Sequence, residues 1–279
     1  MKVKHLSNTA DKNFFKSTPG RRIQDRALKE RVLALTGAFE TGELFPECFA
    51  ALGNNFDGQG ISFGVLQWNF GQNSLQPLLR KMNCTYPGIC KEALGFLYTD
   101  FERMLNMNSK DQLAWSKSIQ YIHVESGKTR WSIDTEWTKA FKALGLTDEM
   151  ICIETEAAGI VYKNALSLAS DYQVSTERGV ALMFDILTQN GKLDKNGAGS
   201  RIKDDFRKIS NDLSMEDKQV EKMKIIAIRR AEVCSSSFSK DVLDRKLTIA
   251  QGKGVVHSRF YKLDRDFNIT LKSVQISEA

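Results

Sequence analysis

A glycine-rich segment near the start of the chain constrains its fold most strongly. Residues 53–72 read GNNFDGQGISFGVLQWNFGQ and contain five glycines but a single carboxylate, Asp57. A plain hairpin needs one or two glycines, so this density indicates tight turns and close approach to the backbone. Ile61, Phe63 and Val65 alternate with small or polar residues, which favours strands. We expect a small β-hairpin near residues 54–68.

Most of the remaining chain shows helical periodicity. In IQDRALKERVLALTGAFE the apolar residues recur at helical spacing, and Thr41-Gly42 gives a stop signal. Further helices are predicted near 74–82, 90–106, 110–122 and 133–144, over 149–172 as one long helix, and over 179–191, 215–236 and 239–252. Residues 252–276 read as irregular or strand-like. The pattern predicts a predominantly helical α+β fold without internal repeats.

The composition is that of a globular protein. The 279 residues are 42% hydrophobic and 27% charged, and this length suits one large domain or two lobes that share a cleft. Residues 1–20 contain lysines but no apolar core of a secretory signal, so we expect a polar tail or arm there, followed by one domain over 21–279. No apolar run is long enough to predict a membrane span.

Cysteine and histidine usage bears on compartment and metals. Five cysteines without a C-x-x-C pair indicate reduced thiols and synthesis in the cytoplasm without a signal peptide. The three histidines are far apart, so the sequence predicts no metal site, and no cofactor motif is present.

The net charge of +6 and the pI of about 9.0 favour an anionic partner. The alternative is a surface that is merely basic. No predicted helix carries a dense lysine and arginine stripe, and no nucleic-acid-binding motif is present, so nucleic acid is not the expected partner. The basic pairs Arg229-Arg230 and Arg245-Lys246 suit solvated or salt-bridged structure, or contact with anionic groups.

Two carboxylates stand out by position. Glu40 ends the first long helix directly after Phe39, and Asp57 begins the glycine-rich segment. Glycosidic cleavage needs such a pair, with one acid that protonates the leaving oxygen and one carboxylate that activates water. Burial against Phe39 would keep Glu40 protonated, while exposure would leave Asp57 ionised. The alternative is that both are ordinary turn residues; Glu43 and Glu47 compete as the acid, but a solvated loop suits them less.

The residues around Asp57 strengthen the catalytic interpretation. The hydroxyl of Ser62 is placed to hold the water that Asp57 activates. Trp68 offers a face for a sugar ring, with core packing as the alternative. Amide groups suited to sugar hydroxyl and N-acetyl groups are provided by Gln59, Gln67, Asn69 and Gln72.

The series from Glu40 to Asp57-Gly-Gln-Gly-Ile-Ser62-Phe-Gly-Val-Leu-Gln-Trp68 resembles the catalytic segment of the chitosanase branch of the lysozyme superfamily. The resemblance covers roughly residues 30–72. It implies a lysozyme-like fold with two lobes around a cleft, Glu40 as general acid, Asp57 as general base, Ser62 as the water-positioning residue, and hydrolysis with inversion. One position departs: chitosanases have Arg after the Asp-Gly pair, and this chain has Gln59.

Two later segments carry a weaker resemblance. The helix that ends with Gln189-Asn190-Gly191 is similar to the family's later cleft helix. The segment from Asp244-Arg245-Lys246 to His257 resembles the C-terminal part of bacterial peptidoglycan-hydrolase relatives. The resemblance therefore implies substrate contact at Gln189, Asn190 and His257, although a turn-stabilising role is the alternative for His257.

Charge guides the choice of substrate. Chitosan is a polycation and suits an acidic cleft, whereas peptidoglycan carries anionic stems that attract a basic protein. We therefore expect a muramidase-like glycan-strand hydrolase that acts in the periplasm or cell wall after delivery by a non-classical route, as an antibacterial effector of type VI secretion or a phage lysin. An effector implies a cognate immunity protein and a secretion-machine carrier. The alternatives are a chitosanase with the same chemistry and a non-catalytic glycan-binding module.

Overall fold

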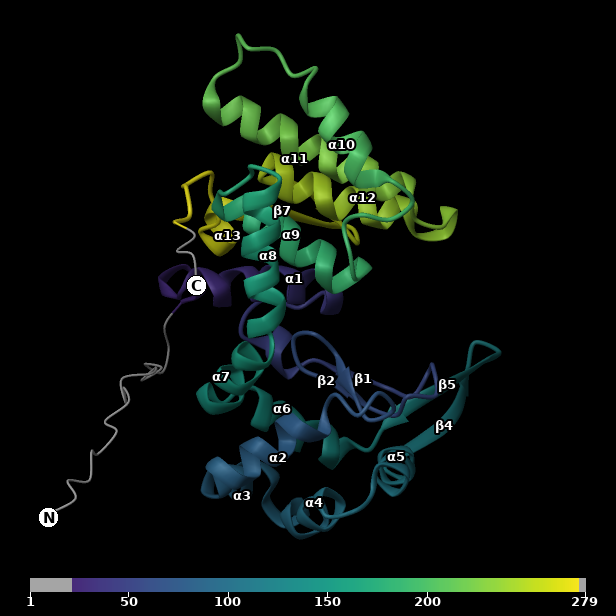
Figure 1. Ribbon diagram of the computed structural model, residues 1–279. Coiled ribbons are helices and arrows are strands. Elements are labelled where there is room, and N and C mark those ends of the chain that lie inside the picture. The colour runs from purple at the N-terminus through teal and green to yellow at the C-terminus, as the bar shows by residue number, and fades with distance from the viewer. Residues whose placement is uncertain (1–21, 276–279) are drawn as a thin grey trace, which may run out of the picture.

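The computed structural model describes residues 22–275, so the predicted N-terminal tail, residues 1–20, lies outside the described residues. The described chain forms two lobes, each with its own buried apolar core. Figure 1 shows the larger lobe above and the smaller lobe below, with α7 (Asp148–Ala157) between them. The predicted α+β, mostly helical, two-lobed fold is confirmed. The single domain over 21–279 stays a prediction.

The larger lobe is built around two helices that are buried over most of their length, α1 (Leu28–Thr41) and α9 (Glu177–Asn190). Phe39 of α1 packs edge-on against Tyr261, with ring centroids 5.1 Å apart. The other elements of this lobe are η1 (Ile23–Asp25), α8 (Gly159–Asp171), α10 (Ala198–Phe206), α11 (Met215–Glu232), α12 (Ser236–Gln251), β6 (Lys253–Val256), β7 (Arg259–Lys262) and α13 (Leu263–Phe267).

The smaller lobe combines a three-stranded antiparallel sheet with short helices. The sheet order is β1 (Leu52–Gly53), β2 (Ser62–Phe63) and β3 (Trp68–Asn69). The sheet is preceded by η2 (Glu47–Ala50) and followed by α2 (Gln76–Thr85), α3 (Pro87–Leu94), η3 (Gly95–Leu97), α4 (Tyr98–Leu105), α5 (Ser109–Ser118), β4 (Gln120–Glu125), β5 (Lys128–Ile133) and α6 (Thr135–Gly145). None of the helices within residues 22–275 is long and apolar enough to cross a membrane.

The small hairpin predicted near residues 54–68 is present as β2 and β3, and β1 adds a third strand to it. Ser62 in the middle strand pairs with Gly53 on one side and Asn69 on the other. Most of the segment forms turns. Gly64 and Gln67 adopt positive φ angles of 82° and 54°, which reverse the chain between β2 and β3. The glycines therefore serve turns that fold the segment back twice.

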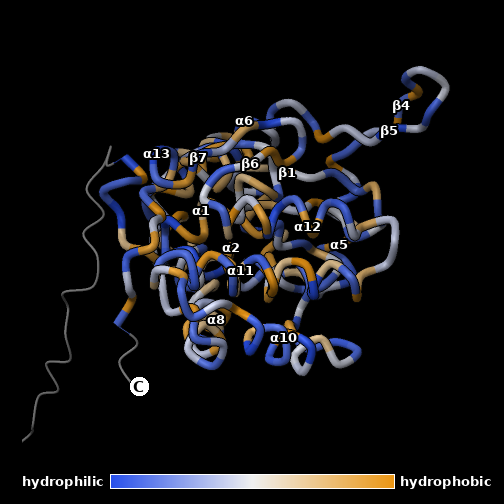
Figure 2. The backbone as a smooth tube through the Cα atoms, turned by 90° about the horizontal axis from the view of Figure 1, so that it is seen from above, coloured by the Kyte–Doolittle hydropathy of each residue, from blue (hydrophilic) through white to orange (hydrophobic). Residues whose placement is uncertain are grey.

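The prediction of a helix over 110–122 was wrong at its C-terminal end. The helix α5 stops at Ser118, and β4 and β5 form a hairpin joined by Ser126 and Gly127. Both turn residues have positive φ, 52° and 75°, which is typical of the two-residue turns that match strand twist. Figure 2 shows this hairpin projecting from one edge of the molecule.

The long helix predicted over 149–172 was also wrong, because it breaks at Ala158 into α7 and α8. Gly159 opens the second helix and has low helix propensity. The break lets α7 serve both cores, since Ile151 packs in the larger core and Ile153 in the smaller one. The strand-like prediction for residues 252–276 is confirmed in part by β6 and β7, which α13 follows.

Candidate active site

Glu40 lies at the C-terminal end of α1, where Gly42 stops the helix in the left-handed conformation with φ of 76°. Its side chain is 30% exposed, whereas the neighbouring Phe39 is fully buried. The Oε1 atom of Glu40 lies 2.8 Å from Nη1 of Arg245, whose guanidinium also lies over the Phe39 ring, 5.4 Å from its centroid. An aromatic ring therefore lies beside Glu40 as expected. The group that contacts the Glu40 carboxyl directly is the guanidinium of Arg245 rather than an apolar side chain.

Arg245 belongs to a buried ionic network. Its Nη2 atom lies 2.5 Å from Oδ1 of Asp185, and Nζ of Lys246 lies 2.7 Å from the other oxygen of Asp185. Burial alone would raise the pKa of Asp185, but the charges of Arg245 and Lys246 outweigh it and hold that pKa below its ordinary value. Asp185 thus faces two cations, and Glu40 is the member of the network that reaches solvent.

The network extends to two further residues that the sequence singled out. Lys246 donates to the side-chain oxygen of Gln189, whose Nε2 donates to Asp241 over 2.7 Å. His257 contacts the other oxygen of Asp241 through Nε2 at 2.6 Å. Glu40, Gln189 and His257 are therefore brought together, but Gln189 and His257 bind protein groups. Asn190 lies next to them with its side-chain oxygen buried and without a partner among the described residues.

Asp185 and Asp241 were not predicted from the sequence, which suited the Arg245-Lys246 pair to solvated or salt-bridged structure or to contact with anionic groups. Both basic residues are buried in salt bridges, at 2% and 0% exposure. A signal was available: Asp185 is the one charge inside the apolar run GVALMFDILTQNG. A lone acid in an otherwise buried helix requires cationic partners.

Asp57 lies on the smaller lobe, exposed in the turn between β1 and β2. Its Oδ1 atom accepts from the backbone N–H of Gln59 over 3.1 Å, so the second oxygen remains open to solvent. The turn is built around Asn55, which is 6% exposed and accepts from the backbone N–H of Gly60 over 2.8 Å. Because the backbone N–H of Asn55 also donates to the side-chain oxygen of Gln120 at the base of the β4–β5 hairpin, over 2.9 Å, that hairpin fixes the turn that carries Asp57.

Ser62 forms a hydrogen bond that the sequence did not predict. Its hydroxyl donates to the side-chain oxygen of Gln67 over 2.8 Å. The amide nitrogen of Gln67 in turn donates to the backbone oxygens of Gly64 and Ala51, at 2.8 and 3.3 Å. Through these hydrogen bonds Gln67 stabilises the three-stranded sheet. The lone pairs of the Ser62 oxygen remain available to accept a hydrogen bond from water.

The other predicted binding residues on this segment are mostly engaged in the fold. Trp68 is half-buried and packs against both cores. Asn69 is buried, and its side-chain oxygen accepts from the backbone N–H of Gln72 over 2.8 Å. The backbone oxygen of Gln59 accepts from Gly71 over 2.8 Å. The side chain of Gln72 is the most open of this set to a ligand.

A cavity of about 550 Å³ lies next to the segment that follows α1, and neither Glu40 nor Asp57 is among its lining residues. One wall comes from the residues that follow Glu40, and the opposite wall comes from β1, the β4–β5 hairpin and α6. The lining residues are Thr41, Glu43, Glu47, Ala50, Ala51, Leu52, Asn54, Tyr121, Trp131, Ser132, Ile133, Thr138, Lys142 and Leu146. We call it the hairpin cavity. Tyr121 and Trp131 are aromatic candidates that the sequence analysis missed, because their hairpin was not recognised.

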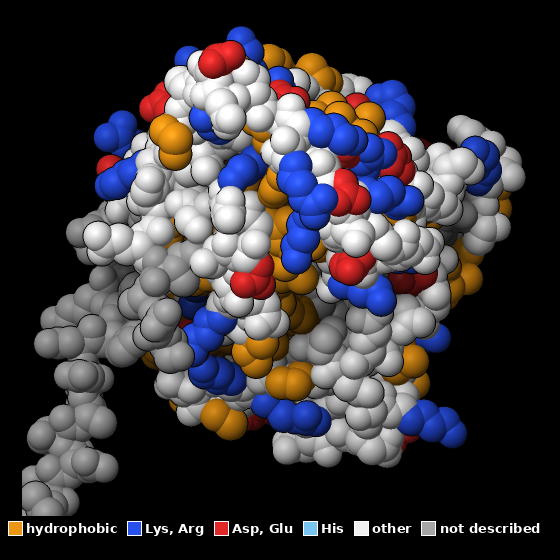
Figure 3. All heavy atoms as spheres, turned by 45° about the horizontal axis from the view of Figure 1, so that its top comes forward, with side chains coloured by type: hydrophobic (Ala, Val, Ile, Leu, Met, Phe, Trp, Pro, Cys, Tyr) orange, Lys and Arg blue, Asp and Glu red, His pale blue; other side chains and the backbone are white. Residues whose placement is uncertain are grey.

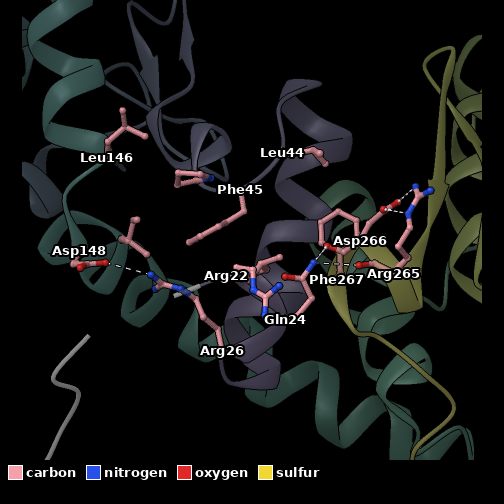
Figure 4. A pocket seen from close by; sticks show the side chains of 13 residues that line it. Arg22, Gln24, Arg26, Leu44, Phe45, Leu146, Asp148, Arg265, Asp266 and Phe267 are labelled. Atoms are coloured by element: carbon pink, nitrogen blue, oxygen red, sulfur yellow. Dashed lines mark hydrogen bonds and ion pairs between the residues drawn. The ribbon is translucent and has the colours of Figure 1, made fainter. Parts of the chain in front are cut away.

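A larger cavity, of about 710 Å³, lies on the other side of the Leu44–Pro46 loop, and Leu146 lines both cavities. We call it the arginine cavity. Its charges are already paired, as Figure 4 shows: Arg26 bonds to Asp148 over 3.2 Å, and Arg265 bonds to Asp266 over 2.6 Å. Arg26 also lies over the Phe45 ring, 4.6 Å from its centroid. Neither Glu40 nor Asp57 lines the arginine cavity.

Comparison with known proteins supports the fold. No family model and no curated protein matches this sequence. A GH46 chitosanase of Gynuella sunshinyii, solved in complex with chitotetraose, superimposes with a TM-score of 0.51 at 12% identity over 85% of this chain and 97% of that one. Chitosanase OU01 with substrate and another chitosanase complex each give 0.49 at 13% identity, over 84% of this chain and 95% of theirs. At this identity the similarity identifies the lysozyme-like fold.

Proposed function

We propose that the protein is a glycoside hydrolase that cleaves the β-1,4-linked glycan strands of peptidoglycan. One observation carries the proposal: the two candidate carboxylates belong to different lobes, and each is held by its own buried scaffold. Glu40 is fixed from the larger lobe by Arg245. Asp57 is fixed on the smaller lobe by the turn around Asn55. Glycosidic cleavage requires one such carboxyl group on each side of the bound sugar.

The proposed roles follow from this arrangement. Glu40 donates its proton to the leaving glycosidic oxygen, while Asp57 takes a proton from the water that attacks the anomeric carbon from the opposite face. The lone pairs of Ser62 orient that water. Arg245 stabilises the Glu40 carboxylate that forms when the proton leaves, because its guanidinium is already 2.8 Å away. An inverting reaction of this kind needs carboxyl groups about 6.5–9.5 Å apart when substrate is bound.

Surface charge supports peptidoglycan as the substrate. The chain carries a net charge of +6, and Figure 3 shows lysine and arginine side chains gathered on the face that the larger lobe presents. Anionic stem peptides would be attracted to such a face. Chitosan is the second candidate, favoured by Glu43 and Glu47 in the hairpin cavity and by the chitotetraose bound to the similar chitosanase.

The biological setting follows from the substrate and is part of the proposal. A peptidoglycan hydrolase made with reduced cysteines suits an antibacterial effector or a phage lysin that reaches the periplasm or cell wall by a non-classical route. An effector would be exported with a secretion-machine carrier and neutralised in the producing cell by an immunity protein.

Incubation with purified peptidoglycan and, separately, with chitosan tests this function. Mass analysis of the released fragments should show muropeptides cut within the glycan strand. Release of chitosan oligomers alone would replace the first candidate with the second. No cleavage of either polymer, by a protein whose circular dichroism confirms that it is folded, would contradict both.

A further inference from the structure

The hairpin cavity contains charges that the fold leaves without partners. Glu43, Glu47 and Lys142 line it, all three are exposed, and none forms an ion pair within residues 22–275. In the arginine cavity, by contrast, Arg26 and Arg265 are already paired. Charges of both signs that converge on one concave site without neutralising each other are available to a ligand that carries the complementary charges.

The walls of the hairpin cavity link it to both catalytic elements. Thr41 directly follows Glu40. Asn54 precedes the Asp57 turn, and its Nδ2 atom donates to the backbone oxygen of Trp131 over 2.8 Å. Tyr121, whose ring is half-exposed, and Trp131 add aromatic surface to the lining from opposite faces of the β4–β5 hairpin. The cavity is therefore lined by chain neighbours of both candidate catalytic residues, while Glu40 and Asp57 themselves lie outside its lining.

We propose that the hairpin cavity binds the stem peptide of a peptidoglycan strand, through the ammonium and carboxylate groups of that peptide. This inference rests on the proposed function and deepens it. Glu43 and Glu47 receive the ammonium group, Lys142 receives a carboxylate, and the apolar lining residues Leu52, Ile133 and Leu146 cover the aliphatic part. A cavity of about 550 Å³ has the size of sites that enclose small ligands, so it accommodates a short peptide.

A polysaccharide without peptides has fewer charged groups that can pair with the charges of this cavity. N-acetylated sugars carry no ammonium group, so two carboxylates would face them without a counter-charge. De-N-acetylated glucosamine does carry an ammonium group, but it leaves Lys142 unpaired. The stem peptide carries groups of both signs on one flexible chain, whereas a stripped strand offers its lactyl carboxylates, and after de-N-acetylation its ammonium groups, only at fixed positions on the sugar rings. Charge-assisted hydrogen bonds are the stronger class.

The test compares kcat/KM on three forms of one peptidoglycan preparation: intact, stripped of stem peptides with an amidase, and stripped and then de-N-acetylated. The variants are the double substitution Glu43→Gln with Glu47→Gln, and Lys142→Met. Lys139→Met is the matched control, because Lys139 lies on the same helix and pairs with Glu136 outside the cavity. We expect the wild type and the control to prefer the intact form by about tenfold, and both cavity variants to lose most of that preference.

Equal kcat/KM on intact and stripped strands would overturn the inference, as would a preference for the de-N-acetylated form. A preference for the intact form that survives in both cavity variants would also overturn it. Titration with a soluble disaccharide-tetrapeptide keeps the inference separate from the proposed function. If the wild type binds this fragment about tenfold more tightly than the cavity variants but cleaves no strand, the hydrolase proposal fails and the stem-peptide site stands.

Discussion

Two fully buried carboxyl groups flank the candidate active site, and the protein accommodates them in opposite ways. Asp185, on α9, is 0% exposed and faces two cations. Glu154, on α7, is also 0% exposed, but its one partner is the backbone N–H of Val65, at 2.8 Å, and its Oε1 atom has none among the described residues. Burial raises the pKa of Glu154 well above its ordinary value, and the bond from Val65 offsets only part of this.

The difference shows what each group does for the site. The ionised Asp185 holds Arg245 in place, and Arg245 holds Glu40, so charge in the larger lobe positions the candidate acid. Glu154 packs against Gly64, where a Cβ atom would lie 2.6 Å from its Oε1, and accepts from the backbone N–H of the next residue, Val65. It therefore fixes the turn that follows Ser62.

Replacing Asp185 should give the largest change in stability. Asp185→Ala leaves two buried cations with Glu40 as their remaining carboxylate, and removing one member of a buried pair costs about 3–5 kcal/mol. Asp204→Ala is the control, since Asp204 forms an exposed pair with Arg207 and should cost less than about 1 kcal/mol. Urea unfolding measures both. Similar losses for the two variants would show that the buried network does not support the larger lobe.

The contrast with Glu154 gives a pH-dependent prediction. Below the ordinary pKa of a glutamate, Glu154 is protonated in both folded and unfolded chains, so it does not lower the free energy of unfolding. As the pH rises, the unfolded chain ionises first, because the folded pKa is raised, and stability declines. Glu154→Gln does not titrate, so its Tm should fall less than that of the wild type between pH 4 and pH 8. About 1 kcal/mol corresponds to about 2–4 °C for a domain of roughly this size.

Melting curves at several pH values check this prediction. Glu156→Gln is a suitable control, because Glu156 lies on the same helix with half of its side chain exposed, in a pair with Lys81. A Tm for Glu154→Gln that declines with pH as steeply as that of the wild type would contradict a raised pKa for Glu154.

Ser62 should give the smallest change in stability. Ser62→Ala removes the hydroxyl bond to Gln67, which is worth about 1 kcal/mol. If Ser62 also orients the attacking water, kcat falls more than KM rises, because the contact acts in the transition state. Ser62→Thr keeps the hydroxyl and should retain most of the activity. An alanine variant that melts earlier but turns over at the wild-type rate would assign Ser62 to the sheet alone.

Local patterns predicted much of the fold and the position of both carboxylates. Helical spacing and Gly42 located the end of α1 and therefore Glu40, and the glycine density located the turn that carries Asp57. The β4–β5 hairpin was missed because the helical pattern of residues 110–122 continues into β4. Its two-residue turn contains Ser126 and Gly127 rather than a more typical Asn-Gly pair.

The partners of Glu40 could not be predicted by the same means. Arg245 and Asp185 lie 60 residues apart in the sequence, and no local spacing brings them together. Their contact depends on how α9 packs against α12, which is a property of the folded lobe. The sequence located the candidate carboxylates, while the groups that surround them could be known only from tertiary packing.

The most direct test of the account is the rate at which reducing ends are released from purified peptidoglycan by the wild type and by Glu40→Gln. The amide keeps the shape of the side chain but has no proton to donate. General acid catalysis typically contributes about 10²–10⁴-fold, so we expect a loss of that size, with circular dichroism and Tm close to those of the wild type. A folded variant that retains more than about a tenth of the wild-type rate would contradict Glu40 as the general acid.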